Sequence, residues 1–303
     1  MSYRFAFGEP VAEGARRICN EQIDRALDEI DDDERSLHDR VHQVRKRCKK
    51  IRGLARLVRP ALGSDYSAIN AYFRDTARPL SALRDAHAMV EMLDDLQLVD
   101  TEDAREADRT AVREALVRRR DALCGEVDVL SLLRTVRMRL EEGRATPRTW
   151  PLDREGFDAV EKGLRRTAKR ARKAMRNATD EGTPAAHHEW RKRVKYLWYH
   201  LRLLRRIWTA PMEGLEDEAH RCASLLGDDH DVAVFRSIAD HEEDLAAAPG
   251  LQRIQQALAR RSTLWRQDAL DIGLRLHDEK PKRFTRRLRV WSEVANCPRH
   301  ADH

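Results

Sequence analysis

The sequence predicts an all-α protein of two pseudo-symmetric four-helix bundle halves, an internal duplication, arranged around a basic central groove. Three observations support this fold class. Ala, Leu, Arg and Glu are abundant among the 303 residues, whereas glycines number 13 and aromatic residues only 6%, which favours helices over strands. Apolar residues recur every three or four positions, which is the period of an α-helix. One block of basic sequence also occurs twice.

The first half of the chain is expected to form four helices separated by prolines, glycines and an acidic cluster. Pro10 suits the first turn of a helix, because the amide proton that proline lacks is not needed there. Pro79 is expected to kink the third helix, and Thr101 is expected to cap the fourth. The predicted helices of this first repeat, residues 10–142, cover about 10–34, 35–60, 64–93 and 101–142.

The second half is expected to repeat this order after a linker. Gly143, Pro147 and Pro151 interrupt the helical pattern over residues 143–154. We expect the tail after Pro298 to be disordered. The predicted helices of the second repeat, residues 155–296, cover about 155–178, 184–209, 211–245 and 251–277, followed by a short helix from Pro281.

The basic helix of the first half carries the strongest signal. Between Asp39 and Asp65 it has nine Lys or Arg and no acidic residue. One helical face is apolar, and a cationic stripe headed by a histidine lies beside it. Like charges on neighbouring turns repel each other, so a stripe without carboxylates indicates an anionic ligand. The apolar face consists of Val41, Val44, Cys48, Ile51, Ala55, Val58 and Leu62, and the stripe of His42, Arg45, Lys49, Arg52, Arg56 and Arg59.

The same pattern returns 146 residues further along the chain. HQVRKRCKKI at 42–51 aligns without a gap with HEWRKRVKYL at 188–197, and the same offset carries Asp85 onto Asp231. An isolated basic run is usually a solvated helix face, but the duplication and the lack of interleaved acids favour a binding site. We therefore expect the two basic helices to face one shared groove about a pseudo-two-fold axis.

These residues resemble the conserved-histidine α-helical domain, or CHAD, family. The resemblance covers roughly residues 5–295, so we expect a single CHAD domain over 1–300 without a triphosphate-tunnel domain. It implies two four-helix bundles around a basic cavity that binds inorganic polyphosphate. It also implies a cytoplasmic protein at polyphosphate granules, with granule-associated proteins as candidate partners. The resemblance rests on H-x-x-R-K-R-x-K at 42–49 and 188–195, and on Arg84-Asp85 and His230-Asp231.

A polyphosphate receptor needs rows of cationic donors. Arg can bind phosphate oxygens through two N–H groups, and Lys supplies a mobile point charge. His42 and His188 are expected to hydrogen-bond phosphate, which would couple protonation to binding, unless they only cap their helices. The helix at 155–178 is expected to flank the same site. The predicted polyphosphate-binding residues are His42, Arg45, Lys46, Lys49, Arg52, Arg56, Arg165, Lys169, Arg172, Lys173, His188, Arg191, Lys192, Lys195 and Arg202.

A metal-dependent phosphohydrolase is one alternative. His230-Asp231 is similar to the HD dyad of such enzymes, but the aligned residue of the first repeat is Arg84, which cannot bind a metal. Asp85 and Asp231 are candidate metal ligands, although salt bridges that orient a basic side chain are the favoured interpretation. No phosphate-loop, HExxH or nucleophile motif occurs. The sequence therefore predicts a binding protein without catalytic residues, metal or cofactor.

A nucleic-acid-binding protein is the other alternative, because phosphate contacts would serve there too. Single-strand binders add aromatic residues for base stacking. Here we expect Trp190, Trp198 and Trp208 to lie at or beside packing positions, and we expect the basic stripes to have no aromatic partners. The five scattered cysteines predict reduced thiols in the cytoplasm. No run reaches the roughly 18–20 apolar residues of a membrane span, so no membrane insertion is expected.

Overall fold

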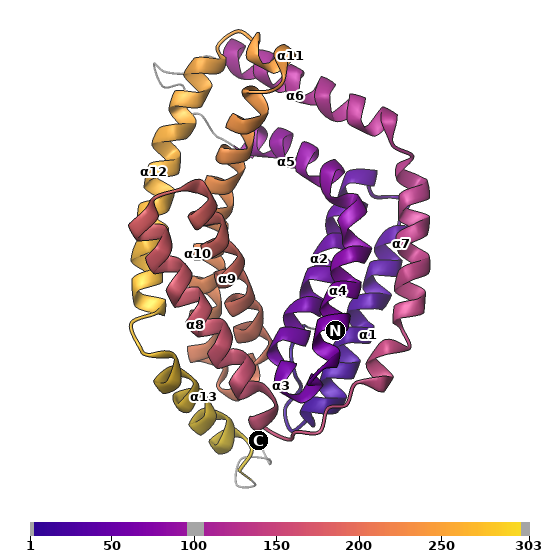
Figure 1. Ribbon diagram of the computed structural model, residues 1–303, viewed down its shortest axis with the longest axis vertical. Helices are drawn as coiled ribbons and strands as arrows, with labels where there is room; N and C mark the ends of the chain where they lie inside the picture. Colours follow the sequence, from indigo (N-terminus) through magenta and orange to yellow (C-terminus); the bar gives the residue numbers. More distant parts are fainter. Residues whose placement is uncertain (1–2, 96–105, 298–303) are drawn as a thin grey trace.

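A computed structural model describes residues 3–95 and 106–297, and every regular element in these two stretches is a helix (Figure 1). The prediction of an all-α fold is confirmed for them. None of these helices is long and apolar enough to cross a lipid bilayer. The predicted cap at Thr101 and the predicted disordered tail lie outside the described residues.

In the first half, the described residues form seven α-helices, which follow the predicted order except at one point. The single helix predicted over 101–142 is wrong, because Asp128 starts a new helix there: its side chain accepts a hydrogen bond from the Ser131 amide at 2.9 Å. The helices are α1 (Val11–Asp31), α2 (Leu37–Leu57), α3 (Arg59–Leu62), α4 (Asp65–Ala77), α5 (Ser81–Asp95), α6 (Glu106–Glu126) and α7 (Val129–Gly143).

The second half begins after a connection that packs against α1. Trp150 is only 2% exposed, and its carbonyl accepts a hydrogen bond from Arg16 Nη2 at 3.0 Å. The α-helices are α8 (Asp158–Glu181), α9 (Pro184–Leu203), α10 (Thr209–Ala239), α11 (Glu243–Ala246), α12 (Leu251–Leu276) and α13 (Pro281–Ala295). Short 3-10 helices are η1 (Arg78–Leu80), η2 (Thr146–Thr149) and η3 (Arg205–Ile207).

The two halves meet at both ends of the molecule and diverge between them (Figure 1). At one end α2 and α3 contact α8, and α2 also contacts α9. At the other end α5 contacts α10, and α6 contacts α11 and α12. The basic helices α2 and α9 therefore contact each other near the lower end in Figure 1 and diverge above it, where α5 and the upper part of α10 join the two halves.

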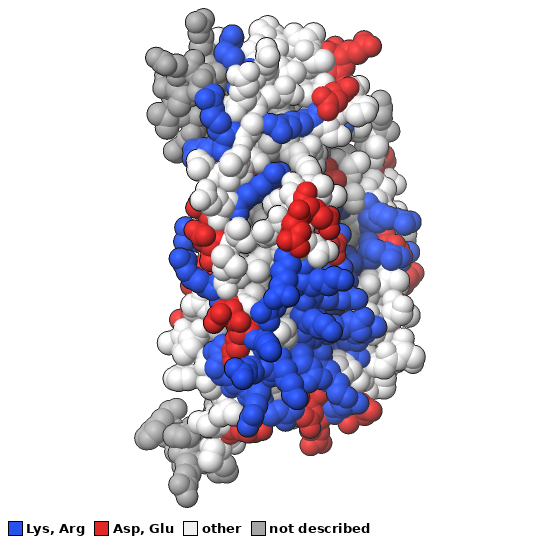
Figure 2. Space-filling model, turned by 60° about the vertical axis from the view of Figure 1, so that its left-hand side comes forward, with Lys and Arg blue, Asp and Glu red and all other residues white. Residues whose placement is uncertain are grey.

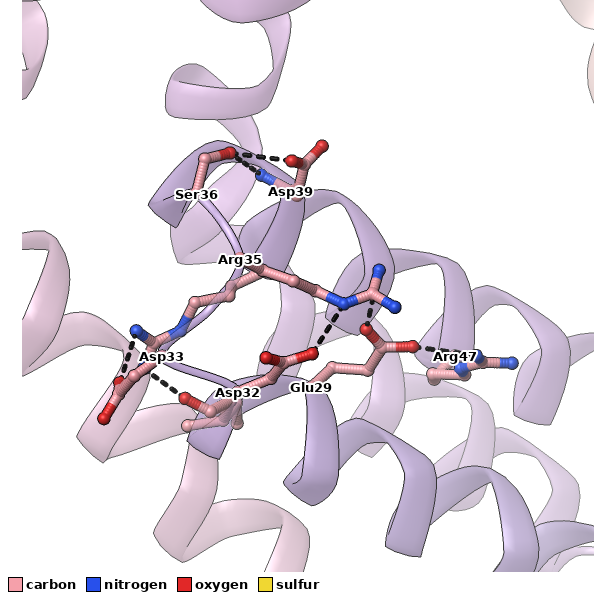
Figure 3. A network of polar contacts seen from close by, with 9 residues as sticks. Glu29, Asp32, Asp33, Arg35, Ser36, Asp39 and Arg47 are labelled. Atoms are coloured by element: carbon pink, nitrogen blue, oxygen red, sulfur yellow. Dashed lines mark hydrogen bonds and ion pairs between the residues drawn. The ribbon is translucent and has the colours of Figure 1, made fainter.

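The apolar face predicted for the basic helix is buried as expected. Val44 and Ile51 are fully buried in the main core, together with Ile18 and Ile23 of α1. The acidic end of α1 pairs with the other edge of α2, where Glu29 binds Arg47 at 2.9 Å (Figure 3). Charge neutralisation therefore occurs on the α1 side of α2 and leaves the cationic stripe free to face elsewhere.

The contact between α8 and the first half depends on a glycine. A Cβ atom at Gly163 would lie 1.9 Å from the carbonyl oxygen of Leu57, so the backbones of α8 and α2 touch there. Gly53 of α2 allows a second close approach, since an added Cβ would lie 2.9 Å from Tyr199 of α9. Helices α8 and α9 of the second half are thereby held against α2.

The N-terminal segment spans the junction between the halves. The Tyr3 hydroxyl donates to the carbonyl of Lys50 in α2 at 2.6 Å. The Phe5 amide donates to the carbonyl of Leu203 at the end of α9, at 3.0 Å. Tyr3 is 1% exposed, so this segment is part of the packing between the halves.

Candidate functional site

The cationic faces of α2 and α9 line a cavity of about 360 Å³ together with α5 and α10. Four predicted site residues of α2 and two of α9 line this cavity, which we call the central cavity. Its lining includes His42, Arg45, Lys46, Lys49, Arg84, Asp85, Arg191, Lys195, Trp198, His220, His230 and Asp231.

A second cavity of about 260 Å³ adjoins the central cavity and is called the side cavity. Lys49, Arg191 and Lys195 line both, so the two cavities lie next to each other at these cations. The side cavity is lined by Lys49, Arg52, His188, Arg191, Lys192, Lys195, Tyr196 and Tyr199. Nine of the fifteen residues predicted from the sequence thus border this pair of cavities.

The two central lysines repel neighbouring cations. Surrounding protein atoms, and then the charge of Lys195, lower the pKa of Lys49 to about 7. Burial and Arg191 likewise lower the pKa of Lys195 to about 8. Among the described residues, no carboxylate forms an ion pair with either lysine or with Arg191 within 4 Å. The site therefore keeps a net positive charge, because Asp85 and Asp231 also line the central cavity but are fewer than its cations.

The two arginines of the repeated motif are held in place differently. Arg45 Nη1 donates to the carbonyl of Ala77 at 3.1 Å and to the Ser81 hydroxyl, so it is anchored where α4 gives way to α5. Arg191 packs against α10 at Gly227, where an added Cβ would lie 3.2 Å from Arg191 Nη2. Both guanidinium groups are thereby oriented before any ligand arrives.

The motif histidines are neutral at pH 7. Burial and then Arg84 lower the pKa of His42 to about 4. Burial, followed by Lys192, also lowers the pKa of His188, whose ring lies 3.9 Å from that of His230. A neutral imidazole offers one N–H donor and one acceptor nitrogen.

The two aspartates of the repeat lie beside the cations without pairing closely. Neither Asp85 nor Asp231 has an ion-pair partner within 4 Å in the described part of the chain, so the expected salt bridges are absent there. Burial raises the pKa of Asp231, whereas Arg191 opposes this rise. No group of three or more His, Cys, Asp or Glu among the described residues is arranged to hold a metal ion.

The remaining predicted site residues lie elsewhere. Arg56 lines a depression shared with α8, which is described below. Arg202 lies 3.7 Å from Glu216, and Arg172 lies near the buried His277. Arg165, Lys169, Arg172 and Lys173 of α8 border neither the central nor the side cavity.

Several cavity residues were not predicted as site residues, and Arg84, Trp198 and His220 are three of them. Arg84 lines the central cavity and donates to Glu91 at 2.6 Å; its place in the repeat, aligned with His230, was the available signal. Trp198 packs against the main core as expected, and it also lines the cavity, with its ring centroid 4.2 Å from that of His220. No spacing in the sequence marks His220 as a neighbour of Trp198.

The expectation that the basic stripes lack aromatic partners is wrong. The Arg56 guanidinium lies over the ring of Tyr196 at 4.2 Å. Arg59 lies over the ring of Tyr66 at 4.3 Å. These rings come from α9 and α4, so the helical period of α2 carries no sign of them.

Comparison with known proteins identifies the domain type. A family model described as the CHAD domain matches residues 18–240, which is more than half of the chain. The match begins in α1 and ends just after α10, and so includes every helix that lines the central and side cavities. No protein in the curated collection searched matches the chain.

Proposed function

The chain belongs to the CHAD family, and we propose that it binds inorganic polyphosphate in the central and side cavities. CHAD domains are known in general as polyphosphate-associated helical domains and are typically non-catalytic. The family accordingly favours a binding role over the phosphohydrolase reaction. The site residues would be those of α2 and α9 that border the two cavities, with Arg84 as an addition from α5.

One observation carries this proposal: the cluster of Lys49, Arg191 and Lys195 has no carboxylate partner among the described residues. Burial and then repulsion from neighbouring cations lower the pKa of both lysines, so their charged forms are unfavourable in the site without a ligand. A polyanion would remove this repulsion. A chain of phosphates suits the cavities better than a single anion, because the cations extend through both spaces.

The two halves are proposed to be copies of one ancestral unit. His188 contacts His230 of α10, and Arg84 of α5 is close enough to His42 to lower its pKa. The offset of 146 residues aligns these two pairs with each other. A pseudo-two-fold relation would then place equivalent cations on both walls of one groove. In a cell, such a site would direct the protein to polyphosphate granules in the cytoplasm or organise them.

Binding can be tested by calorimetric titration with polyphosphate at about 150 mM salt, where surface charges are well screened. The test variant is Lys49→Glu/Lys195→Glu, and the matched control is Lys280→Glu/Lys282→Glu, which reverses two exposed charges away from both cavities. We expect the test variant to lose at least about 100-fold in affinity, because two cations become anions inside the site. Equal affinities for the two variants would refute the proposed site.

Nucleic acid is the other polyanion to test. The ring of Tyr196 is covered by Arg56, and Trp198 is covered by His220, so these aromatic faces are already occupied. Base stacking on them would have to displace protein side chains. In a competition experiment we expect polyphosphate to displace DNA or RNA of matched charge. If nucleic acid displaces polyphosphate, the ligand is wrongly assigned.

A further inference from the structure

A second group of cations lies outside the central and side cavities, at the junction of α2, α3, α8 and α9. Five arginines surround a depression of about 20 Å³, together with Tyr66, Gly163, Thr167 and Tyr196. The depression is too small to enclose a phosphate, which would instead lie across its mouth. We call this group the arginine cluster, and it consists of Arg56, Arg59, Arg166, Arg170 and Arg193.

Backbone packing brings these arginines together. Because α8 touches α2 at Gly163, the residues three and seven positions later, Arg166 and Arg170, lie on the same helical face next to the contact. Arg56 and Arg59 lie on the other side, where α2 ends and α3 begins. The closeness of the five charges is evident at Arg170, whose pKa is lowered by burial and then by the other four arginines.

Two of the guanidinium groups are held rigidly and two are open to solvent. Arg56 is fixed by the ring of Tyr196 and by Asn70 Oδ1 at 3.3 Å, and Arg59 by the ring of Tyr66. Arg166 and Arg170 are exposed and have no ion pair in the described part of the chain. Figure 2 shows basic side chains gathered over the lower half of the molecule, where α8 lies.

One carboxylate partly neutralises the positive charge of the arginine cluster. Glu189 forms an ion pair with Arg193, and its second oxygen binds Lys192 at 2.5 Å. Four of the five arginines remain without such a partner among the described residues. The cluster is therefore a net cationic surface with preoriented guanidinium groups, which matches the oxygen geometry of phosphate.

The arginine cluster lies next to the side cavity. Arg52 lines the side cavity and Arg56 belongs to the cluster, and they are one turn apart on α2, about 6 Å along the helix. Asn70 Oδ1 accepts hydrogen bonds from both, at 3.2 Å from Arg52 Nε and 3.3 Å from Arg56 Nη2. Tyr196 borders both spaces.

We propose that the arginine cluster is a second phosphate-binding site that receives the part of a long polyphosphate chain leaving the side cavity along α2. This inference rests on the proposed function, because it needs a chain that already occupies the cavities. Binding of the second segment is then intramolecular, so its affinity adds to that of the first. A short chain that fills only the cavities gains nothing. The protein therefore selects long chains over short ones.

The test compares tripolyphosphate with long-chain polyphosphate in calorimetric titrations at about 150 mM salt. The cluster variant is Arg166→Glu/Arg170→Glu, and the control is Arg283→Glu/Arg286→Glu, two exposed arginines of α13 with the same change in net charge. All four side chains are exposed, so folding should be preserved, and thermal unfolding verifies it. Arg166→Gln/Arg170→Gln removes the charges without reversing them.

For the cluster variant, we expect affinity for the long chain to fall about tenfold or more, and that for tripolyphosphate to change no more than in the control. Equal losses in the cluster and control variants would overturn the second site, as would equal losses for the short and long chains. Either result would leave standing the proposal that polyphosphate binds in the central and side cavities. By contrast, long-chain binding that survives in Lys49→Glu/Lys195→Glu would overturn the proposed function itself.

Discussion

Replacing the two central lysines by glutamine should stabilise the empty protein. In the folded state the pKa of Lys49 falls from 10.5 to about 7 and that of Lys195 from 10.5 to about 8. One pKa unit corresponds to about 1.4 kcal/mol, so these shifts are nominally worth several kcal/mol. Lys49 is exposed to the water of the cavities, which screens its charge. We therefore expect Lys49→Gln/Lys195→Gln to gain only about 1–2 kcal/mol at pH 7.

The pH dependence of this gain has a defined sign. When the pKa of a lysine is lower in the folded state than in the unfolded state, its charge lowers the free energy of unfolding by the full amount at pH values below the folded-state pKa. This destabilisation disappears as the pH approaches 10.5, the pKa in the unfolded state. Wild-type stability should therefore rise between about pH 7 and 10, and the variant should lack this rise. Added salt should also narrow the difference between them, because it screens the repulsion.

Thermal unfolding followed by circular dichroism measures both effects. A gain of about 1–2 kcal/mol should raise Tm by about 2–6 °C, and Lys280→Gln/Lys282→Gln should show no comparable rise. With saturating polyphosphate the order should reverse, because the wild type binds more tightly and gains more stability. A double variant less stable than the wild type without ligand would refute the argument that burial of these two charges, and their repulsion from neighbouring cations, destabilises the fold.

Three further predictions concern protonation and packing. Polyphosphate binding near pH 8 should take up protons, because the ligand favours charged Lys49 and Lys195; calorimetry in two buffers of different ionisation enthalpy measures this, and zero uptake would contradict it. Gly163→Ala should cost about 2–4 kcal/mol in urea unfolding, whereas Gly214→Ala, with nothing within 4 Å, should be neutral or slightly stabilising. Acid should destabilise the fold between about pH 6.5 and 4, because burial lowers the pKa of His200 to about 3 and that of His277 to about 4; denaturant titrations that show constant stability over this range would exclude the mechanism.

Periodicity predicted which face of α2 is buried but not what each neighbouring face meets. The buried positions of α2 followed from the spacing of apolar residues alone. The place of α8 did not, because its cationic stripes are equally consistent with a central groove and an outer surface. The contact of Gly163 with Leu57 decides between these, and a tertiary contact of this kind leaves no local pattern.

The missed features have similar causes. The break at Asp128 lies between two valines, with no proline to mark it, so the spacing of apolar residues does not reveal the capping contact with Ser131. Trp198 lies beside the packing positions of α9, and only its contact with His220 of α10 shows that the ring forms part of the cavity wall. By contrast, the repeated motif was informative because both copies place their basic residues on helices that lie together.

The hydrogen bond from Phe5 to Leu203 has a consequence for synthesis on the ribosome. The N-terminal segment cannot take its final place until about 200 further residues have been made, which takes about 10–40 s at translation rates of roughly 5–20 residues per second. Until then the face of α2 around Gly53, which later receives Tyr199, is exposed. The newly made first half therefore passes through a period in which a chaperone or a premature partner can occupy the surface meant for α9.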